Sequence, residues 1–298
     1  EDVVMNNLKE QRRKRRWKLF FRLLIFAYLF FLTFMYFFGP PKSLQAAKAM
    51  KGDHTAVIKV YGLIAENHDA SADNIIRAMH KAFKNEDAKG IILRINSPGG
   101  SPVQSRMVYD EIKHLQKKYP DKKVISAIED SGTSAAYLVA SATDEIYADE
   151  TSIVGSIGVL FNSFGFDALM EKIGITRRLY TSGTHKGMLD PFSPVNEAEK
   201  QMLEEELNTI HLQFIENVKK GRGDRLELSE EIFSGRFWSG YQAKSIGVID
   251  GFGNYRTLAR DTFKTTEIID YTAQKGFKEY LKKYYKMSAS LLEVLKGW

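Results

Sequence analysis

The chain contains no cysteine among its 298 residues. This absence excludes disulfide bonds, cysteine-ligated zinc and iron–sulfur sites, and catalysis by a thiol nucleophile. It leaves the compartment open, because a chain without thiols is compatible with oxidising and reducing surroundings alike. The sequence also lacks internal repeats and low-complexity tracts, and 44% of its residues are apolar. That composition is ordinary for a globular protein and excludes disorder as the main state.

Excess positive charge is scarce outside one short region. The net charge is +6, from 43 basic and 37 acidic residues. Residues 1–22 hold eight Lys and Arg residues and three acidic ones, which leaves 35 basic and 34 acidic residues elsewhere. The body of the chain is therefore nearly neutral, and the sequence argues against nucleic acid as a partner.

One long apolar run, Leu19–Phe38, lies near the N-terminus, and only Arg22 and Thr33 in it are neither apolar nor aromatic. As a helix it would span about 30 Å, the thickness of the hydrocarbon core of a bilayer. It exceeds the core of a cleaved secretory signal, so we predict an uncleaved transmembrane signal anchor over residues 19–38. Basic residues precede it, so the positive-inside rule predicts that residues 1–18 are a cytoplasmic tail and that the rest is exported.

The remaining sequence divides into a polar linker at 39–52, a domain at 53–265 and a C-terminal extension at 266–298 that we expect to be helical. Within the domain, short β-branched runs alternate with segments of helical spacing. This alternation predicts an α/β fold with a mainly parallel sheet covered by helices. The expected strands are 56–60, 91–95, 124–128 and 146–148, and the expected helices are 72–83, 103–118 and 196–220.

The last expected helix carries an apolar stripe that we expect to face the core, formed by Leu203, Leu207, Ile210, Phe214 and Val218. The C-terminal extension is aromatic and basic. We interpret it as a packing or subunit-contact helix, with a membrane-surface helix as the alternative.

Two turns that follow expected strands carry residues suited to chemistry. In the first, Asn96–Pro102, two glycines are adjacent, Gly99 and Gly100. Glycines there allow backbone N–H groups to point into a cleft, as in an oxyanion hole or a phosphate site, although a plain strand-to-helix turn has the same pattern. The turn lacks the Gly-Lys-Ser/Thr of a P-loop, so no nucleotide is implied.

The second turn contains Ser131 and Ser134 between an expected strand and small residues suited to a helix. A hydroxyl at this place would face solvent at a helix N-terminus, which favours developing negative charge. As a bare pattern, however, either serine could equally be a helix N-cap.

A serine nucleophile needs a base, and one loop offers two. His185 could act with Asp190 as a triad, or Lys186 could act alone. A lysine accepts a proton only if its pKa falls from about 10.4 to near neutrality, which burial among neutral groups can achieve. The residue types alone leave both bases open.

Five blocks of the sequence carry a family likeness: 95–100, 133–134, 152–159, 182–186 and 235–250. In this order they resemble signal peptide peptidase A, a membrane-anchored serine protease of bacteria whose fold is similar to ClpP and the crotonases. The resemblance extends from about Ala56 to Ala259, and the single Ser block and single Lys block are similar to the short, single-domain form of the family. It implies a ClpP/crotonase-like fold of parallel sheets covered by helices.

The resemblance also implies roles for particular residues and requires no metal and no cofactor. Ser134 would be the nucleophile and Lys186 the general base of a Ser–Lys dyad, with Ser156 orienting the lysine. The backbone N–H of Gly100, joined by that of Ala135, would form the oxyanion hole. His185 would then be a neighbour of the base.

One departure from the family concerns the residues after the nucleophile. The family usually has two glycines there, whereas this chain has Ala135 and Ala136. Alanine retains the backbone N–H, so the oxyanion role survives, but a positive φ would be strained and the methyl groups would narrow the adjoining pocket.

Taken as a whole, the resemblance implies a serine endopeptidase of the bacterial inner membrane, with its catalytic domain on the extracytoplasmic side. Its substrates would be signal peptides that remain in the membrane after cleavage from secreted proteins. The resemblance to the short form of the family also implies assembly into an octameric ring. In such a ring, neighbouring protomers supply the nucleophile and the base of each site. The alternatives are a non-catalytic peptide-binding scaffold of the same fold, and a crotonase-type acyl-CoA enzyme, against which an exported domain argues because CoA is cytoplasmic.

Overall fold

The computed structural model describes residues 2–38, 52–227 and 229–273. They fall into two compact units, Glu1–Gly52 and Asp53–Trp298, which are described separately. Almost all of the predicted linker and most of the predicted C-terminal helical extension lie outside the described residues.

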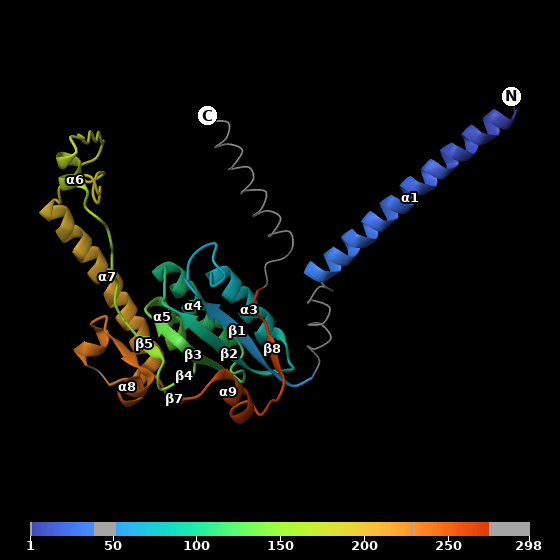
Figure 1. Cartoon of the computed structure of the whole chain (residues 1–298). Helices are drawn as coiled ribbons and strands as arrows, with labels where there is room; N and C mark the ends of the chain where they lie inside the picture. The colour runs from blue at the N-terminus through green and yellow to red at the C-terminus, as the bar shows by residue number, and fades with distance from the viewer. Residues whose placement is uncertain (1, 39–51, 228, 274–298) are drawn as a thin grey trace. The chain divides into compact units, whose positions relative to one another are not determined.

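The described part of the first unit is a single helix, α1 (Asp2–Phe38), which contains the predicted anchor segment (Figure 1). Its stretch Arg12–Phe34 is long and apolar enough to cross a bilayer, judged by length and composition. The side chains of this stretch are exposed, as a lipid-facing helix requires.

The second unit is built on a mainly parallel sheet with the strand order β6-β5-β3-β2-β1-β8. All pairings are parallel except that of β5 with β6. The four predicted strands are present, each at least as long as predicted, and the predicted α/β architecture is confirmed. The strands are β1 (His54–Tyr61), β2 (Ala88–Ser97), β3 (Val124–Thr133), β4 (Glu145–Ala148), β5 (Ile153–Gly155), β6 (Phe237–Ser239), β7 (Gly251–Phe252) and β8 (Ile268–Asp270).

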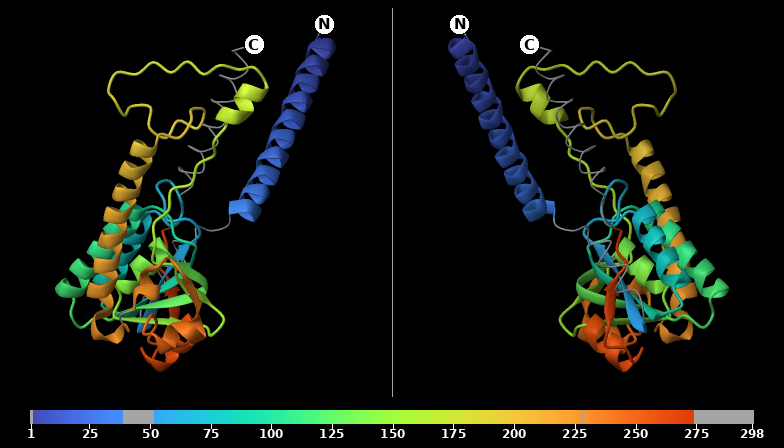
Figure 2. Two further views of the ribbon diagram at one scale, coloured as in Figure 1. Left: turned by 90° about the vertical axis from the view of Figure 1, so that its left-hand side faces the viewer. Right: turned by 90° about the vertical axis from the view of Figure 1, so that its right-hand side faces the viewer.

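The helices cover this sheet, and the three predicted ones are confirmed to within two residues at each end (Figures 1 and 2). The caps explain the boundaries: the Ser101 hydroxyl accepts from the Gln104 N–H before α4, and the Asn196 side chain caps α7. The helices are α3 (Ala72–Lys84), α4 (Pro102–Lys118), α5 (Ala135–Ser141), α6 (Asp167–Lys172), α7 (Glu197–Arg222), α8 (Gly240–Ser245) and α9 (Tyr255–Asp261).

The sheet continues past residue 265, where we predicted the end of the domain. Strand β8 pairs in parallel with β1, and the phenol of Tyr271 lies 2.9 Å from the ring nitrogen of the buried His54. The first residues of the predicted C-terminal extension are therefore part of the sheet.

Only the C-terminal part of α7 packs against the core. Phe214 and Val218 are buried, whereas Leu203, Leu207 and Ile210 are only partly covered. The prediction that the whole stripe faces the core was wrong for these three residues, because the helix extends beyond the sheet (Figures 1 and 2).

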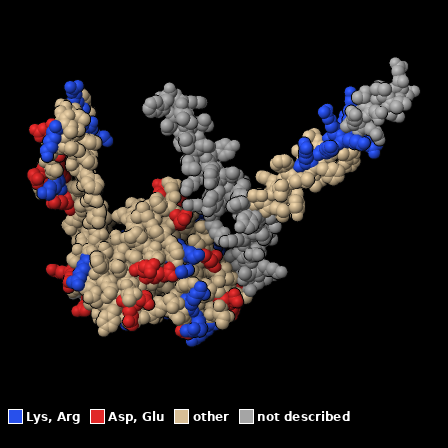
Figure 3. Space-filling view, in the orientation of Figure 1, with Lys and Arg blue, Asp and Glu red and all other residues tan. Residues whose placement is uncertain are grey.

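The N-terminal half of α7 forms a projection, here called the arm, together with residues 160–196. The segment that contains α6 and the far end of α7 both lie away from the sheet (Figures 1 and 2). Charged groups are found at the tip of the arm, and much of the remaining visible surface carries none (Figure 3). Large apolar side chains are exposed along it: Leu160, Phe161, Phe164, Phe166, Leu169, Ile173, Ile175, Leu179, Tyr180, Leu189, Phe192 and Val195. Exposed apolar surface of this extent marks an interaction site.

A buried ion pair fastens the C-terminal end of α7 to the segment after α8. Arg222 is fully buried and donates to both carboxylate oxygens of Asp250, at 2.7 and 3.0 Å, and to the carbonyl of Gly247 at 2.7 Å. The same carboxylate accepts from the backbone N–H of Ile146 on β4 at 2.7 Å. Burial alone would raise the pKa of Asp250, but the hydrogen bonds and charge of Arg222 outweigh it and hold this pKa below its ordinary value.

We expect Asp250→Ala to lower the free energy of unfolding by about 3–5 kcal/mol, because Arg222 would stay buried without its counter-ion. Since the pKa of Asp250 is lowered in the folded state, this stabilisation is present above the unfolded pKa of about 3.9 and is lost as the pH falls through the folded value. Urea unfolding of the full chain at neutral and acid pH measures both effects. The matched control is Glu216→Ala, which breaks an exposed ion pair with Lys220; an equal loss in both variants would contradict the prediction.

Candidate active site

Ser134 lies between the end of β3 and the start of α5, as the sequence predicts. Its φ of 54° and ψ of −127° fall in a region that residues with a side chain rarely adopt. Two backbone hydrogen bonds hold it there: its N–H donates to the carbonyl of Gly155 at 2.8 Å, and its own carbonyl accepts from the N–H of Leu138 at 3.1 Å. Ser134 occupies the N-cap position of α5, but its hydroxyl makes no capping hydrogen bond. Strain of this kind is concentrated at functional sites.

The other candidate serine in this turn does not lie on the cavity described below. The hydroxyl of Ser131 is 3.4 Å from the carbonyl of Ser97 and 3.4 Å from the hydroxyl of Thr133. The contact with Ser97 ties the end of β3 to β2, and Ser134, which lines the cavity, is the better nucleophile candidate.

The turn with two glycines lies directly against Ser134. Gly99 has a φ of 105°, and a Cβ placed on it would be 2.8 Å from the Cβ of Ser134. A Cβ on Gly100, with a φ of 147°, would be 2.2 Å from the carbonyl oxygen of Ile64. Only glycine fits at either position.

The same turn presents a backbone donor to the site. The bridge between this turn and Ile64 uses the carbonyl of Gly99 and the N–H of Ser101, which leaves the N–H of Gly100 for a ligand. Ala135 is the first residue of α5, where an N–H has no acceptor within the helix. Gly100 and Ala135, whose N–H groups we predicted to form an oxyanion hole, line the same cavity as Ser134.

Ser156 follows β5 and lies close to the same region. Its φ is 52°, and its N–H donates to the carbonyl of Arg236 at 2.9 Å. β3 pairs with β5 at its carboxyl end, and this pairing brings the block that carries Ser156 beside the block that carries Ser134. Two sequence blocks predicted to act together thus meet through sheet pairing.

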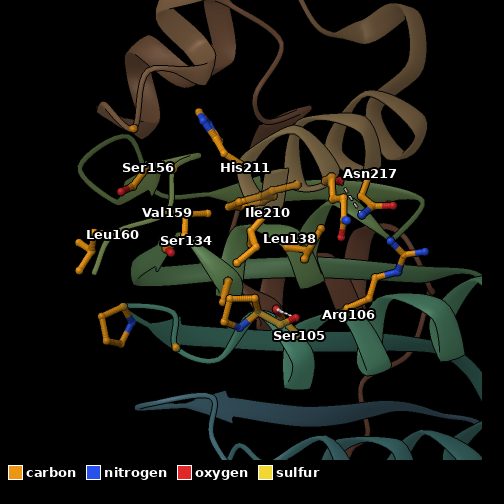
Figure 4. A pocket seen from close by; sticks show the side chains of 18 of the residues that line it. Ser105, Arg106, Ser134, Leu138, Ser156, Val159, Leu160, Ile210, His211 and Asn217 are labelled. Carbon is orange, nitrogen blue, oxygen red and sulfur yellow. Dashed lines mark hydrogen bonds between the residues drawn. The ribbon is translucent and has the colours of Figure 1, made fainter. Parts of the chain in front are cut away.

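A cavity of about 650 Å³ opens at these residues, between α4, α5 and α7 (Figure 4). That volume is in the range of ligand pockets. Four of the five predicted site residues line it: Gly100, Ser134, Ala135 and Ser156.

Lys186 is not among the residues that line the cavity. It is exposed and ends a turn in the arm, where its N–H donates to the carbonyl of Gly183 at 3.2 Å. Within one chain, the arm segment that carries it lies away from the sheet edge at which α5 begins (Figure 1). A single protomer therefore presents the nucleophile and the predicted base on separate surfaces.

The alternative triad is not assembled either. The Nδ1 of His185 lies 3.4 Å from a carboxylate oxygen of Glu199. Asp190 instead accepts from the hydroxyl of Ser193 at 2.7 Å and from Arg177 at 3.3 Å. His185 and Asp190 thus have other partners, and neither lines the cavity.

Sequence reasoning did not single out His211. It lines the cavity, and its Nε2 lies 3.0 Å from the carbonyl oxygen of Ile157. This contact ties α7 to the segment that begins with Ser156. The sequence feature that could have identified His211 is its position directly after Ile210, a residue of the apolar stripe.

We expect His211→Ala to lower kcat/KM for a peptide substrate by about tenfold or more, because Ser156 would lose its tether and small displacements at a reacting site are costly. His211→Gln retains an N–H donor and should restore part of the loss. His114→Ala, at an exposed position of α4, is the matched control and should leave kcat/KM unchanged. Equal activity of the His211→Ala and His114→Ala proteins would show that the tether does not matter.

Comparison with known proteins gives matches over most of the second unit. Peptidase family S49 matches residues 116–268, and Clp protease matches residues 55–150. The chain is 30% identical to a putative protease of Methanocaldococcus jannaschii, over 72% of this chain and 70% of that protein. It is 29% identical to a putative signal peptide peptidase of Enterococcus faecium, over 70% of this chain and 62% of that protein.

The chain is also 45% identical, over 62% of its length, to a protein of Brucella abortus named as a Na⁺/H⁺ antiporter. This match covers only 25% of that protein. The chain thus spans about a quarter of the length of the Brucella protein, and the name of that protein says nothing about the active site of this chain.

Proposed function

Because the chain belongs to peptidase family S49 and is a serine peptidase, we propose that it is a membrane-anchored endopeptidase with Ser134 as its nucleophile. The observation that carries this proposal is the strained Ser134, held against the Gly99–Gly100 turn on the wall of a large cavity. We propose signal peptides left in the bilayer as the substrates.

The proposed reaction starts with attack of the Ser134 hydroxyl oxygen on a peptide carbonyl. The N–H groups of Gly100 and Ala135 stabilise the negative charge that develops on the carbonyl oxygen. The base takes the hydroxyl proton and passes it to the leaving amine, which leaves an acyl-enzyme. Water, activated by the same base, then releases the acyl group and restores the serine.

We propose that the base is Lys186 of a neighbouring protomer, oriented by Ser156 as the resemblance implies. The support is the arm, which carries this lysine among exposed apolar side chains that a second copy would cover. Apolar surroundings favour the uncharged form of an amine, which is the form that accepts a proton. A head-to-tail contact that repeats around an axis closes a ring, and we propose an octameric ring.

We further propose that α1 anchors the enzyme in the bacterial inner membrane, with the peptidase domain on the extracytoplasmic side. The support is the apolar stretch Arg12–Phe34 and the basic residues at its N-terminal side. A tethered active site would meet peptides that lie in the same bilayer.

One observation favours a second candidate, a non-catalytic peptide-binding scaffold: the separation of Lys186 from the cavity within one chain. A fluorophosphonate reagent distinguishes the two, because it modifies a serine only when that serine is activated. We expect labelling of Ser134 in the full-length protein, whereas a scaffold would remain unlabelled.

The substrate proposal is tested by hydrolysis of a set of signal-peptide fragments by the full-length protein in detergent. The comparison set consists of polar, unstructured peptides of equal length. We expect preferential cleavage of the signal-peptide fragments. Equal or faster cleavage of the polar peptides would refute the substrate proposal and leave the peptidase assignment intact.

A further inference from the structure

The cavity at Ser134 has two chemically different ends. Next to Ser134 its walls are apolar, with Leu138, Ile210 and Phe214 contributed by α5 and α7. Beyond these residues lie the side chains of Arg106 and Asn217 (Figure 4). A substrate side chain that enters beside Ser134 therefore passes an apolar section before it meets polar groups.

Asn217 provides an acceptor at the polar end. This residue is only 5% exposed, and its side-chain NH₂ donates to the carbonyl of Gln213 at 2.7 Å. Its carbonyl oxygen, Oδ1, accepts no hydrogen bond from the residues that the structure describes. Oδ1 does not belong to the buried atoms that lack a partner, so it is open to the cavity, where a ligand donor can form a hydrogen bond with it.

Arg106 provides hydrogen-bond donors at the same end of the cavity, and its positive charge is balanced by Asp110. Its Nε donates to both carboxylate oxygens of Asp110, at 2.8 and 2.9 Å. Its two terminal nitrogens make no hydrogen bond within the described part of the chain. Because Asp110 neutralises the guanidinium, this end of the cavity favours a neutral polar group over a carboxylate.

We propose that this cavity is a specificity subsite for a substrate side chain with an apolar body and a neutral hydrogen-bonding tip, of which tyrosine is the best example. The ring would pack against Leu138 and Phe214. The phenol would donate to Oδ1 of Asn217 and accept from Arg106, which matches both open groups. The inference rests on the proposed function, since it assigns the subsite to the substrate of Ser134.

Binding to the full-length Ser134→Ala protein tests the subsite without turnover. The matched peptides are Ala-Ala-Ala-Xaa-Ala-Ala with Tyr, Phe or Glu at Xaa, so that only Xaa can fill the cavity. Calorimetry should give a Kd about tenfold lower for the Tyr peptide than for the Phe peptide, the effect of about one hydrogen bond. The Glu peptide should bind no more tightly than the Tyr peptide.

Two further substitutions in the Ser134→Ala background locate the effect. Asn217→Leu and Arg106→Met should each bring the Tyr-to-Phe ratio of Kd values close to one, and the exposed Arg106 keeps the test valid if Asn217→Leu fails to fold. Arg77→Met, at an exposed position on α3, is the matched control and should leave the ratio unchanged.

Three results would overturn the subsite: equal or undetectable binding of the Tyr and Phe peptides, a ratio that neither substitution changes, or tighter binding of the Glu peptide. Fluorophosphonate labelling of Ser134 in the wild type, combined with any of these, would remove the subsite and keep the peptidase. Tyr selectivity in a protein that is not labelled would instead support the subsite and refute the proposed catalysis.

Discussion

Ser134→Ala should abolish peptide hydrolysis, with a loss in kcat on the order of 10⁶-fold, as expected when a serine peptidase loses its nucleophile. The physical reason is that no acyl-enzyme can form, while the N–H groups of Gly100 and Ala135 remain in place. Single-turnover hydrolysis of a signal-peptide fragment measures the loss. Retention of more than about one hundredth of the wild-type rate would exclude Ser134 as the nucleophile.

Ser134→Gly separates loss of chemistry from loss of folding. At a φ of 54° and a ψ of −127°, a side chain costs about 1–3 kcal/mol, which glycine recovers in the folded state. Glycine also gives the unfolded chain more conformational freedom, which lowers the free energy of unfolding by about 0.4–1 kcal/mol. The Gly variant should therefore be equally inactive but more stable than the Ala variant, by about 1 kcal/mol. A lower thermal midpoint than that of the Ala variant would contradict the strained conformation.

The parts of the fold that depend on local pattern could be predicted from the sequence. The strand at 91–95 is apolar except for Arg94 because it is buried on both faces, and Ile91, Ile92 and Leu93 are all fully buried. The position of Ser134 also followed from local pattern, since a strand that ends before small residues predicts a turn into a helix.

The limits of the sequence lie where distant segments meet. The apolar stripe on α7 has the same pattern whether the helix packs on its own sheet or on another copy, so periodicity could not reveal that Leu203 is only partly covered. Asn217 and Arg106 lie on different helices, and only the packing of α4 and α7 on α5 brings them to one cavity. The sequence likewise does not reveal which residues of a neighbouring protomer Lys186 would contact.

Mixing two inactive variants should restore activity if each site is shared between protomers. A Lys186→Met chain keeps its serine, and a Ser134→Ala chain keeps its lysine. Where the first contributes Ser134 and the second contributes Lys186, the site is complete. Random assembly of equal amounts completes about one site in four, whatever the size of a closed ring with identical contacts. We therefore expect recovery of about a quarter of the wild-type rate.

The experiment uses co-expression of the two full-length variants with different tags, and purification through both tags ensures that every assembly is mixed. Each variant alone should be inactive, whereas Lys172→Met, at an exposed position of α6 in the same arm, should remain active. Because the cavity and the arm of one chain present the serine and the lysine on separate surfaces, recovery is the outcome that we expect if Lys186 of a neighbour is the base. An inactive mixed assembly would show that the base is not supplied by Lys186 of a neighbour, and a base elsewhere on the wall of the cavity would then have to be sought.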